Sequence, residues 1–262
     1  MPVDNSRLSG FFKLSVEERR AKVAELANLS QEETDALANH GELSEDAADR
    51  MIENVIGTMS LPVGVATNFV IDGSQYLIPF CIEEASVVAA ASNMAKRCLV
   101  KGGFRTSSDK PIMISQIQVL ELENTEAAGE AILTAKYELM AICNSLPSTM
   151  IKLGGGCKDI QVRSIDSMSG KMLIIHLLVD TRDAMGANAV NTMAELISDK
   201  VEEITGGRVH LRILSNLASQ RLARVEATFT PEEMSEDGTR DNGTKVISGI
   251  LEAHHFAMAD PY

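Results

Sequence analysis

The chain has 262 residues, 45% of them hydrophobic, and its 24 basic and 37 acidic side chains give a formal charge of −13. This length and apolar content suffice for one large domain or two smaller ones with a buried core. The acidic balance argues against a protein that wraps nucleic acid or lies on an anionic membrane. The chain has no uninterrupted run of about 18 apolar residues, so we expect no transmembrane span. Residues 1–14 lack the pattern of a signal peptide.

The cysteines indicate a reducing compartment. Cys81, Cys98, Cys143 and Cys157 lie far apart in the sequence and form no CxxC motif. This spacing is typical neither of a disulfide scaffold nor of a zinc knuckle. We therefore expect a cytoplasmic protein.

Residues 15–53 predict short surface helices. Ser15 with Glu18, and Ser30 with Glu33, have the spacing of capping boxes. The many acidic side chains of this stretch are typical of a solvated face.

A hairpin and a helix of small residues follow. Thr67–Ile71 and Gln75–Phe80 predict two strands, and Asp72-Gly73 between them suits the positive φ angles of a tight turn. A helix rich in Ala and Ser is expected from Glu83 to about Cys98. Its small side chains let other backbones approach closely, which favours a position at the centre of a domain.

A second organisation begins after residue 110. The order of expected elements is β-α-β-β-α-β, which predicts a ferredoxin-like unit. The expected elements are strand 111–122, helix 127–143, strand 158–165, turn 166–170, strand 171–180, helix 184–204 and strand 208–214.

The predicted class is therefore α/β (α+β), a large domain interrupted by a small one. Residues 1–110 and 216–262 are assigned to the large domain, and 111–215 to the small one. The last segment is expected to hold a strand at 222–230, an acidic loop at 231–244 and a helix at 245–258.

The first candidate site is the acidic pair Glu83-Glu84, before the small-residue helix. One interpretation is a pair of capping acids, because the helix dipole favours negative charge there. The other is a carboxyl group in a dry pocket, where desolvation raises the pKa and lets the group deliver a proton near neutral pH. Adjacent strand residues face opposite ways, so only one would do this, and Ser86 could add a hydroxyl.

The second candidate site is the stretch Asp183-Ala184-Met185-Gly186-Ala187-Asn188, which follows a buried strand and opens a helix. Free N–H groups and the helix dipole favour an anion here, Gly186 removes side-chain bulk, and Asn188 can donate. The structural alternative is that Asp183 is simply the N-cap.

The third candidate is Gly154-Gly155-Gly156, which allows either a close approach to a ligand or a tight turn. Its place before a strand of the same small domain favours a dinucleotide site shared with Asp183. The neighbouring Cys157 is interpreted as a core thiol.

The histidines predict no metal site. His40 is expected in a loop, and His176, in an apolar strand, is expected to be a hydrogen-bonded core residue. The adjacent His254 and His255 cannot form one chelating face of a helix.

Six motifs occur in an order that resembles one known family. They are ENVIG (53–57), PVGVATNF (62–69), EEASVVAAAS (83–92), GGGCKDI (154–160), DAMGANAVNTMAE (183–195) and LRILSNLA (211–218). Together they are similar to the bacterial and archaeal class II 3-hydroxy-3-methylglutaryl-CoA (HMG-CoA) reductases.

The resemblance implies an NAD(P)H-dependent, four-electron reduction of HMG-CoA to mevalonate and CoA, or the reverse. Glu84 matches the family's catalytic glutamate. Ser86 and Asn216 match positions near the substrate. The dinucleotide-binding turn is matched by Asp183, Met185, Gly186 and Asn188.

The resemblance also implies a cofactor, an assembly and a role for each domain. The large domain (1–110 and 216–262) would bind the substrate and dimerise, and the small domain (111–215) would bind the dinucleotide. The family uses a nicotinamide dinucleotide and forms homodimers, often as trimers of dimers. The stretch 144–149 lacks the carboxylate that would bind a ribose 2′-hydroxyl and repel a 2′-phosphate, which favours NADPH or dual use over NADH alone.

Two departures from the family pattern stand out. Ala85 replaces the proline that usually follows the catalytic glutamate, so a fixed φ becomes a free one. The resemblance also implies that the substrate-binding arginine, the catalytic lysine, a second carboxylate and a histidine would all lie beyond Tyr262. On that basis the 262-residue chain alone is expected to lack reductase activity.

Two other classes of function stay open at this point. A truncated, non-catalytic paralogue could serve as a nucleotide-binding or assembly module, and a ferredoxin-like unit could serve as a small-molecule sensor.

Overall fold

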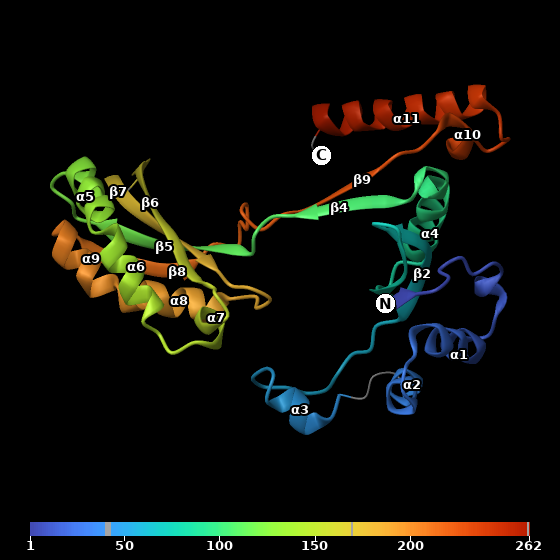
Figure 1. Cartoon of the computed structure of the whole chain (residues 1–262), viewed down its shortest axis with the longest axis horizontal. Coiled ribbons are helices and arrows are strands. Elements are labelled where there is room, and N and C mark those ends of the chain that lie inside the picture. Colours follow the sequence, from blue (N-terminus) through green and yellow to red (C-terminus); the bar gives the residue numbers. More distant parts are fainter. Residues whose placement is uncertain (40–42, 169, 261) are drawn as a thin grey trace. The chain divides into compact units, whose positions relative to one another are not determined.

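The computed structural model describes residues 1–39, 43–168, 170–260 and 262. The chain forms two compact units, each with its own sheet (Figure 1). Unit 1 comprises Met1–Thr106 and Val225–Tyr262, and unit 2 comprises Ser107–Arg224. His40 lies outside the described residues.

Unit 1 is built on a five-stranded sheet with the strand order β1-β3-β2-β4-β9. Strands β2 and β3 form the antiparallel hairpin that the sequence predicts. Asp72 and Gly73 connect them at φ 49° and 83°, so the positive φ angles inferred from this dipeptide are confirmed. The strands are β1 (Pro2–Val3), β2 (Val63–Ile71), β3 (Ser74–Cys81), β4 (Phe104–Ser108) and β9 (Ala223–Ala227).

The N-terminal helices are short, and two begin at capping boxes. Ser15 accepts a hydrogen bond from the Glu18 N–H and Ser30 accepts one from the Glu33 N–H, and both glutamates return the contact to the cap N–H. Both predicted boxes are confirmed. The helices are α1 (Val16–Ala27), α2 (Gln31–Ala38) and α3 (Glu45–Asp49), with short 3-10 turns at Phe11–Lys13 and Leu99–Lys101.

The small-residue helix α4 (Val87–Cys98) begins later than expected. Ser86 is its N-cap and makes no side-chain cap hydrogen bond, so Glu83 and Glu84 precede the helix. One face of α4 packs on β2, where Ala95 and Cys98 are fully buried.

The prediction of an acidic loop at 231–244 is wrong for much of that range. It contains α10 (Pro231–Met234) and the start of α11 (Arg240–Ala259). Thr230 and Thr239 cap these helices by accepting hydrogen bonds from the N–H groups of Glu233 and Asn242. The two helices pack closely, because a Cβ on Gly243 would overlap the Pro231 carbonyl.

Unit 2 has a four-stranded antiparallel sheet with the order β6-β7-β5-β8. Helices separate β5 from β6 and β7 from β8. The strands are β5 (Ile112–Leu120), β6 (Gly156–Ser167), β7 (Gly170–Asp180) and β8 (Arg208–Leu214). The helices are α5 (Thr125–Thr134), α6 (Lys136–Asn144), α7 (Thr149–Lys152), α8 (Ala187–Leu196) and α9 (Ser198–Thr205).

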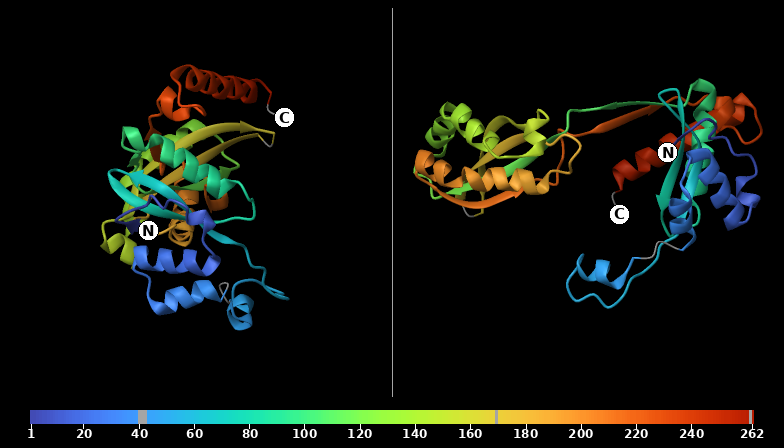
Figure 2. Two further views of the ribbon diagram at one scale, coloured as in Figure 1. Left: turned by 90° about the vertical axis from the view of Figure 1, so that its right-hand side faces the viewer. Right: turned by 60° about the horizontal axis from the view of Figure 1, so that its bottom comes forward.

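The helices of unit 2 cover one face of its sheet (Figures 1 and 2). Alternate residues of β5 and β7, such as Ile117 and Ile175, point at the helices and are fully buried. His176 lies on the other face, 8% exposed. Its Nε2 has no hydrogen-bond partner in the described chain, contrary to the expected hydrogen-bonded histidine.

Two expected helices of unit 2 are each divided in two. The helix expected at 127–143 breaks at Ala135, between α5 and α6, and the helix expected at 184–204 breaks at Ile197, between α8 and α9. Helix α8 begins at Ala187 rather than at 184, because Gly186 before it is left-handed at φ 95°. Such breaks let each helix follow the twisted sheet while Ile197 stays fully buried.

Among the described residues, none of the helices combines the length and the apolar character that crossing a membrane requires.

Candidate functional site

The predicted site residues fall in both units. Glu84 and Ser86 belong to unit 1 and lie between β3 and α4. Both are exposed, and the Ser86 Oγ donates a 3.3 Å hydrogen bond to Glu84 Oε1. The described residues of unit 1 therefore do not by themselves build a dry pocket around Glu84.

The remaining predicted residues lie at one end of unit 2. Residues 181–188, which we call the 181–188 turn, connect the buried strand β7 to α8. The N-cap of α8 is Gly186, with no side-chain cap hydrogen bond, so the alternative of Asp183 as the N-cap is wrong. Asp183, Met185 and Asn188 are all exposed.

The uncapped start of α8 suits an anion. The first N–H groups of a helix have no intrahelical acceptor, and the helix dipole adds partial positive charge there. Gly186 is required at this position, because a Cβ would overlap the side chain of Thr181 beneath it and φ is 95°. The glycine is therefore explained by the left-handed backbone of the turn and by its packing on Thr181.

Thr181 anchors the turn in the core of unit 2. It is fully buried, its N–H donates to the Pro111 carbonyl at 3.0 Å, and its carbonyl accepts from the Ala184 N–H at 3.1 Å. Arg182 follows with φ 54°, and its N–H donates to Asp180 Oδ1 at 3.0 Å.

The three glycines before β6 form a turn that is packed against the protein itself. A Cβ on Gly155 would lie 2.6 Å from the Asp180 carbonyl oxygen, and one on Gly156 would overlap Asn144 Oδ1. Asn144 in turn accepts from the Cys157 N–H at 2.8 Å. Close protein packing thus explains these two glycines without a ligand.

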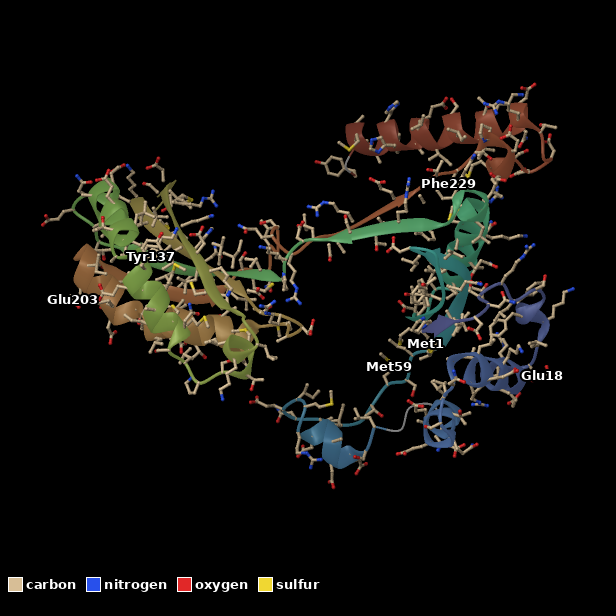
Figure 3. The ribbon with its side chains drawn as sticks, viewed as in Figure 1. Met1, Glu18, Met59, Tyr137, Glu203 and Phe229 are labelled. Atoms are coloured by element: carbon tan, nitrogen blue, oxygen red, sulfur yellow. The ribbon has the colours of Figure 1, made fainter. Side chains whose placement is uncertain are left out.

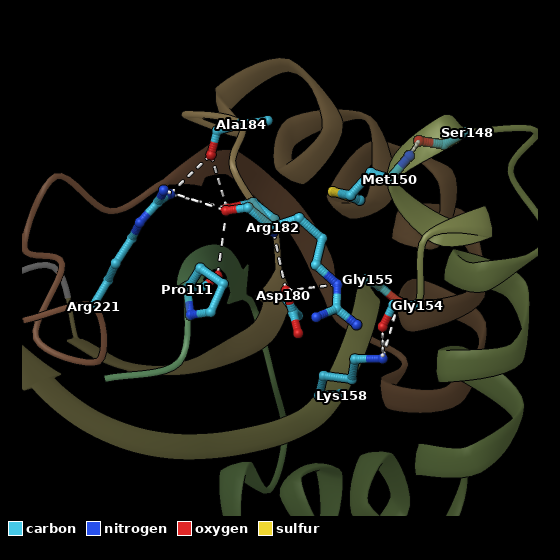
Figure 4. A network of polar contacts seen from close by, with 11 residues as sticks. Pro111, Ser148, Met150, Gly154, Gly155, Lys158, Asp180, Arg182, Ala184 and Arg221 are labelled. Atoms are coloured by element: carbon cyan, nitrogen blue, oxygen red, sulfur yellow. Dashed lines mark hydrogen bonds and ion pairs between the residues drawn. The ribbon is translucent and has the colours of Figure 1, made fainter. Parts of the chain in front are cut away.

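The glycine turn and the 181–188 turn meet, as Figure 4 shows. Gly156 is opposite Asp180 in the β6–β7 pairing, and the Arg182 guanidinium lies beside Gly154. The Lys158 Nζ donates to the carbonyls of Gly154 and Gly155 at 2.8 and 2.9 Å. The glycine turn and the 181–188 turn therefore lie side by side at one end of unit 2, with the cationic side chains of Lys158 and Arg182 next to them.

Asn216 lies in the same unit, in residues 215–222, which we call the 215–222 segment. This segment follows β8, and Asn216 is exposed in it. Its carbonyl accepts from the Ala218 N–H at 3.1 Å. The segment contacts the 181–188 turn through Arg221, whose guanidinium donates to Thr181 Oγ1 at 3.0 Å.

Sequence reasoning missed Arg221 and Thr181. Arg221 lies about 40 positions from the turn that it contacts, so no local spacing could reveal the pairing. Thr181 borders the motif, and only its burial beneath Gly186 shows its role.

Other features do not add to these sites. Two hollows in the described surface, of about 460 and 420 Å³, lie beside α3 and beside β1 and include none of the predicted site residues. No metal-holding cluster of His, Cys, Asp or Glu occurs within the described ranges. The four cysteines are free thiols, of which Cys81 alone is exposed.

Comparison with known proteins gives consistent matches. Residues 15–262 match the family model described as hydroxymethylglutaryl-coenzyme A reductase. The 3-hydroxy-3-methylglutaryl-coenzyme A reductase of Archaeoglobus fulgidus is 54% identical over 258 residues, which is 98% of this chain and 57% of that protein. A probable 3-hydroxy-3-methylglutaryl-coenzyme A reductase of Borreliella burgdorferi is 32% identical over 83% of this chain and 50% of that protein.

A solved structure agrees. The class II 3-hydroxy-3-methylglutaryl-CoA reductase from Streptococcus pneumoniae, bound to NADPH in open conformations, superposes with a TM-score of 0.91 at 35% identity. The match covers 97% of this chain and 68% of that chain. The chain thus spans between half and three-fifths of the length of the two curated relatives.

Proposed function

The chain belongs to the hydroxymethylglutaryl-CoA reductase family, and from that premise we propose that it takes part in the NAD(P)H-dependent reduction of HMG-CoA to mevalonate and CoA, or in the reverse reaction. The observation that carries this proposal is the uncapped N-terminus of α8, packed beside the glycine turn. Four electrons are needed, so two dinucleotides are oxidised for each thioester reduced.

The 181–188 turn fits a dinucleotide by its own chemistry. Its backbone donors and the α8 dipole would hold a diphosphate. Gly186 lets the turn adopt φ 95° directly over Thr181, whose side chain occupies the space of a Cβ. When bound, the reduced nicotinamide supplies hydride. The proposed binding residues are Asp183, Met185, Gly186 and Asn188.

We assign the catalytic proton to Glu84 and a supporting hydroxyl to Ser86. Reduction of a thioester places negative charge on its carbonyl oxygen, and a donor near that oxygen stabilises the transition state. A carboxyl group serves as that donor only while it holds a proton, which requires a desolvated surrounding. Because Glu84 is exposed in unit 1, groups from outside this unit, among them those of another copy of the chain, would have to cover it.

A homodimer, or a trimer of dimers, would supply that cover. The exposed apolar side chains of unit 1, among them Ile56 and Met59, support association. Asn216 is assigned to contact the HMG group.

NADPH or dual cofactor use is favoured over NADH alone. Residues 144–149 hold no carboxylate, and Lys158 and Arg182 add positive charge beside the glycine turn. The four free thiols support a cytoplasmic location, where thiols stay reduced.

Glu84→Gln tests the assignment of the proton donor. We expect turnover to fall by about 10²–10³-fold or more, measured as HMG-CoA-dependent loss of NADPH absorbance. Turnover is measured on the longest protein that the reading frame encodes, because the 262-residue chain alone is expected to lack reductase activity. The fold should be unchanged, because Glu84 is exposed.

Glu83→Gln is the matched control, because it neutralises the adjacent exposed acid. It should leave turnover near that of the unsubstituted protein. Equal activity of the two variants would remove Glu84 from the mechanism. NADPH binding without turnover by the longest form would favour a nucleotide-binding module over an enzyme.

A further inference from the structure

Arg221 joins two segments that are far apart in the sequence. It lies in the 215–222 segment, and its guanidinium reaches across to the 181–188 turn (Figure 4). Its acceptors there are Thr181 Oγ1 at 3.0 Å, the Ala184 carbonyl at 2.9 Å, the Arg182 carbonyl at 3.4 Å and the Met185 carbonyl at 3.5 Å.

These contacts orient three peptide groups. In a trans peptide the C=O and the following N–H point in opposite directions, and no cis peptide bond occurs in the described chain. Carbonyls turned toward Arg221 therefore direct the N–H groups of Asp183, Met185 and Gly186 away from it. Within the described residues these three N–H groups have no acceptor, so they are free to bind an anion.

A second contact ties the same two regions together. The Asn191 side chain in α8 accepts from the Leu214 N–H, at the end of β8, at 2.8 Å. The Ser215 N–H then donates to the Ile114 carbonyl at 2.7 Å. The 215–222 segment is thus fixed both to the sheet and to α8, and Arg221 is held against a turn whose other side is anchored by Thr181.

We propose that Arg221 is a positioning residue. It holds the 181–188 turn so that the N–H donors of the turn face outward, and it fixes the turn beside the segment that carries Asn216. This inference rests on the proposed function, in which the turn binds the dinucleotide and Asn216 the substrate. Arg221 acts on the carbonyl side of the turn and does not touch either ligand. Its planar fork can serve several acceptors at once.

Arg221→Ala and Arg221→Lys test this role. We expect the alanine variant to speed amide hydrogen exchange within residues 181–188 of the ligand-free chain. The dissociation constant for NADPH, followed by nicotinamide fluorescence, should rise about ten- to hundredfold, the range for losing hydrogen bonds to a charged group. The lysine variant should recover part of the affinity, because an ammonium keeps the charge but not the fork.

Arg208→Ala is the matched control. Arg208 begins β8 at the end away from the turn and pairs with Glu121 at 2.8 Å. Its loss should leave both the exchange within 181–188 and the affinity for NADPH unchanged.

The outcomes separate this inference from the proposed function. Unchanged exchange within the turn, or unchanged NADPH binding, in Arg221→Ala overturns the positioning role, as does equal weakening in Arg208→Ala. Absence of NADPH binding by the unsubstituted chain overturns the proposed dinucleotide site, and the exchange comparison then decides whether Arg221 orders the turn at all.

Discussion

The two units differ in how completely they bury their apolar side chains. Of the 29 buried hydrophobic residues in the described chain, 22 lie in unit 2 and seven in unit 1. Both units expose large apolar side chains, and unit 1 exposes more of them, such as Phe12 at 79%, Met59 at 87% and Phe256 at 66% (Met59 is labelled in Figure 3). Unit 2 closes a large core from its own helices and sheet, whereas unit 1 buries few apolar side chains within itself.

The difference follows from the elements of each unit. In unit 2 five helices cover one face of the sheet, and every second side chain along the strands points toward these helices. In unit 1 the 20-residue helix α11 buries only Gly243 among its residues. A helix of this length gains most of its stability from packing. Within the described chain α11 gains less from packing than α8, which buries Val190, Met193 and Ala194.

The largest effect is expected from truncating the core of unit 2. Ile175→Ala removes a fully buried side chain from the centre of β7, and we expect a loss of about 2–5 kcal/mol in the free energy of unfolding. Ile250→Ala in α11, where the side chain is 51% exposed, should cost less than about 0.5 kcal/mol. Urea denaturation measures both, and equal losses would contradict the contrast between the units.

A smaller effect is expected at Gly186. Gly186→Ala adds a Cβ that overlaps Thr181 and places alanine at φ 95°, which should cost about 1–3 kcal/mol. Gly206→Ala is the control, because φ is 67° there but no atom lies within 4 Å of the new Cβ. The comparison by thermal unfolding separates strain from overlap, and a similar loss in both variants would show that Thr181 gives way.

The smallest effect is expected from His176. The pKa of this histidine lies below its usual value of about 6.5. Burial is the larger cause, and the positive charge of Arg163 is the smaller one. The folded chain then binds fewer protons than the unfolded chain below that pH, so stability falls as the pH drops from about 6.5 toward the folded-state pKa. The uncharged Gln116 and Gln161 flank it across the sheet and offer no carboxylate to offset this.

His176→Gln should flatten that dependence. We expect the Tm of the variant to change less than that of the unsubstituted chain between about pH 7.5 and about pH 5.5. His210→Gln, at an exposed position of β8, is the control. An unchanged pH profile in His176→Gln would place the pH-sensitive group elsewhere.

Local signals in the sequence predicted local structure well. The capping box of Ser15 and the turn at Asp72 both depend on neighbours within three residues, and both are confirmed. The strand expected at 208–214 has those bounds as β8. The breaks at Ala135 and Ile197 were missed, because apolar periodicity continues through them and only packing on the sheet divides the helices.

The candidate site could be predicted only in part. The motif around Gly186 indicated a turn before a helix, and the structure has that turn. The contacts of Arg221 and the packing of Gly155 against Asp180 depend on side chains far apart in the sequence. The roles of Glu84, Ser86 and Asn216 stay predictions, because each is exposed in the single chain.

The distribution of the thiols gives unit 1 a built-in attachment point. Cys98, Cys143 and Cys157 are buried, and Cys81 is exposed at the end of β3, three positions before Glu84. A maleimide dye should therefore label the folded chain at one position. Its emission would report directly whether association with a second copy removes water from the surroundings of that carboxyl group.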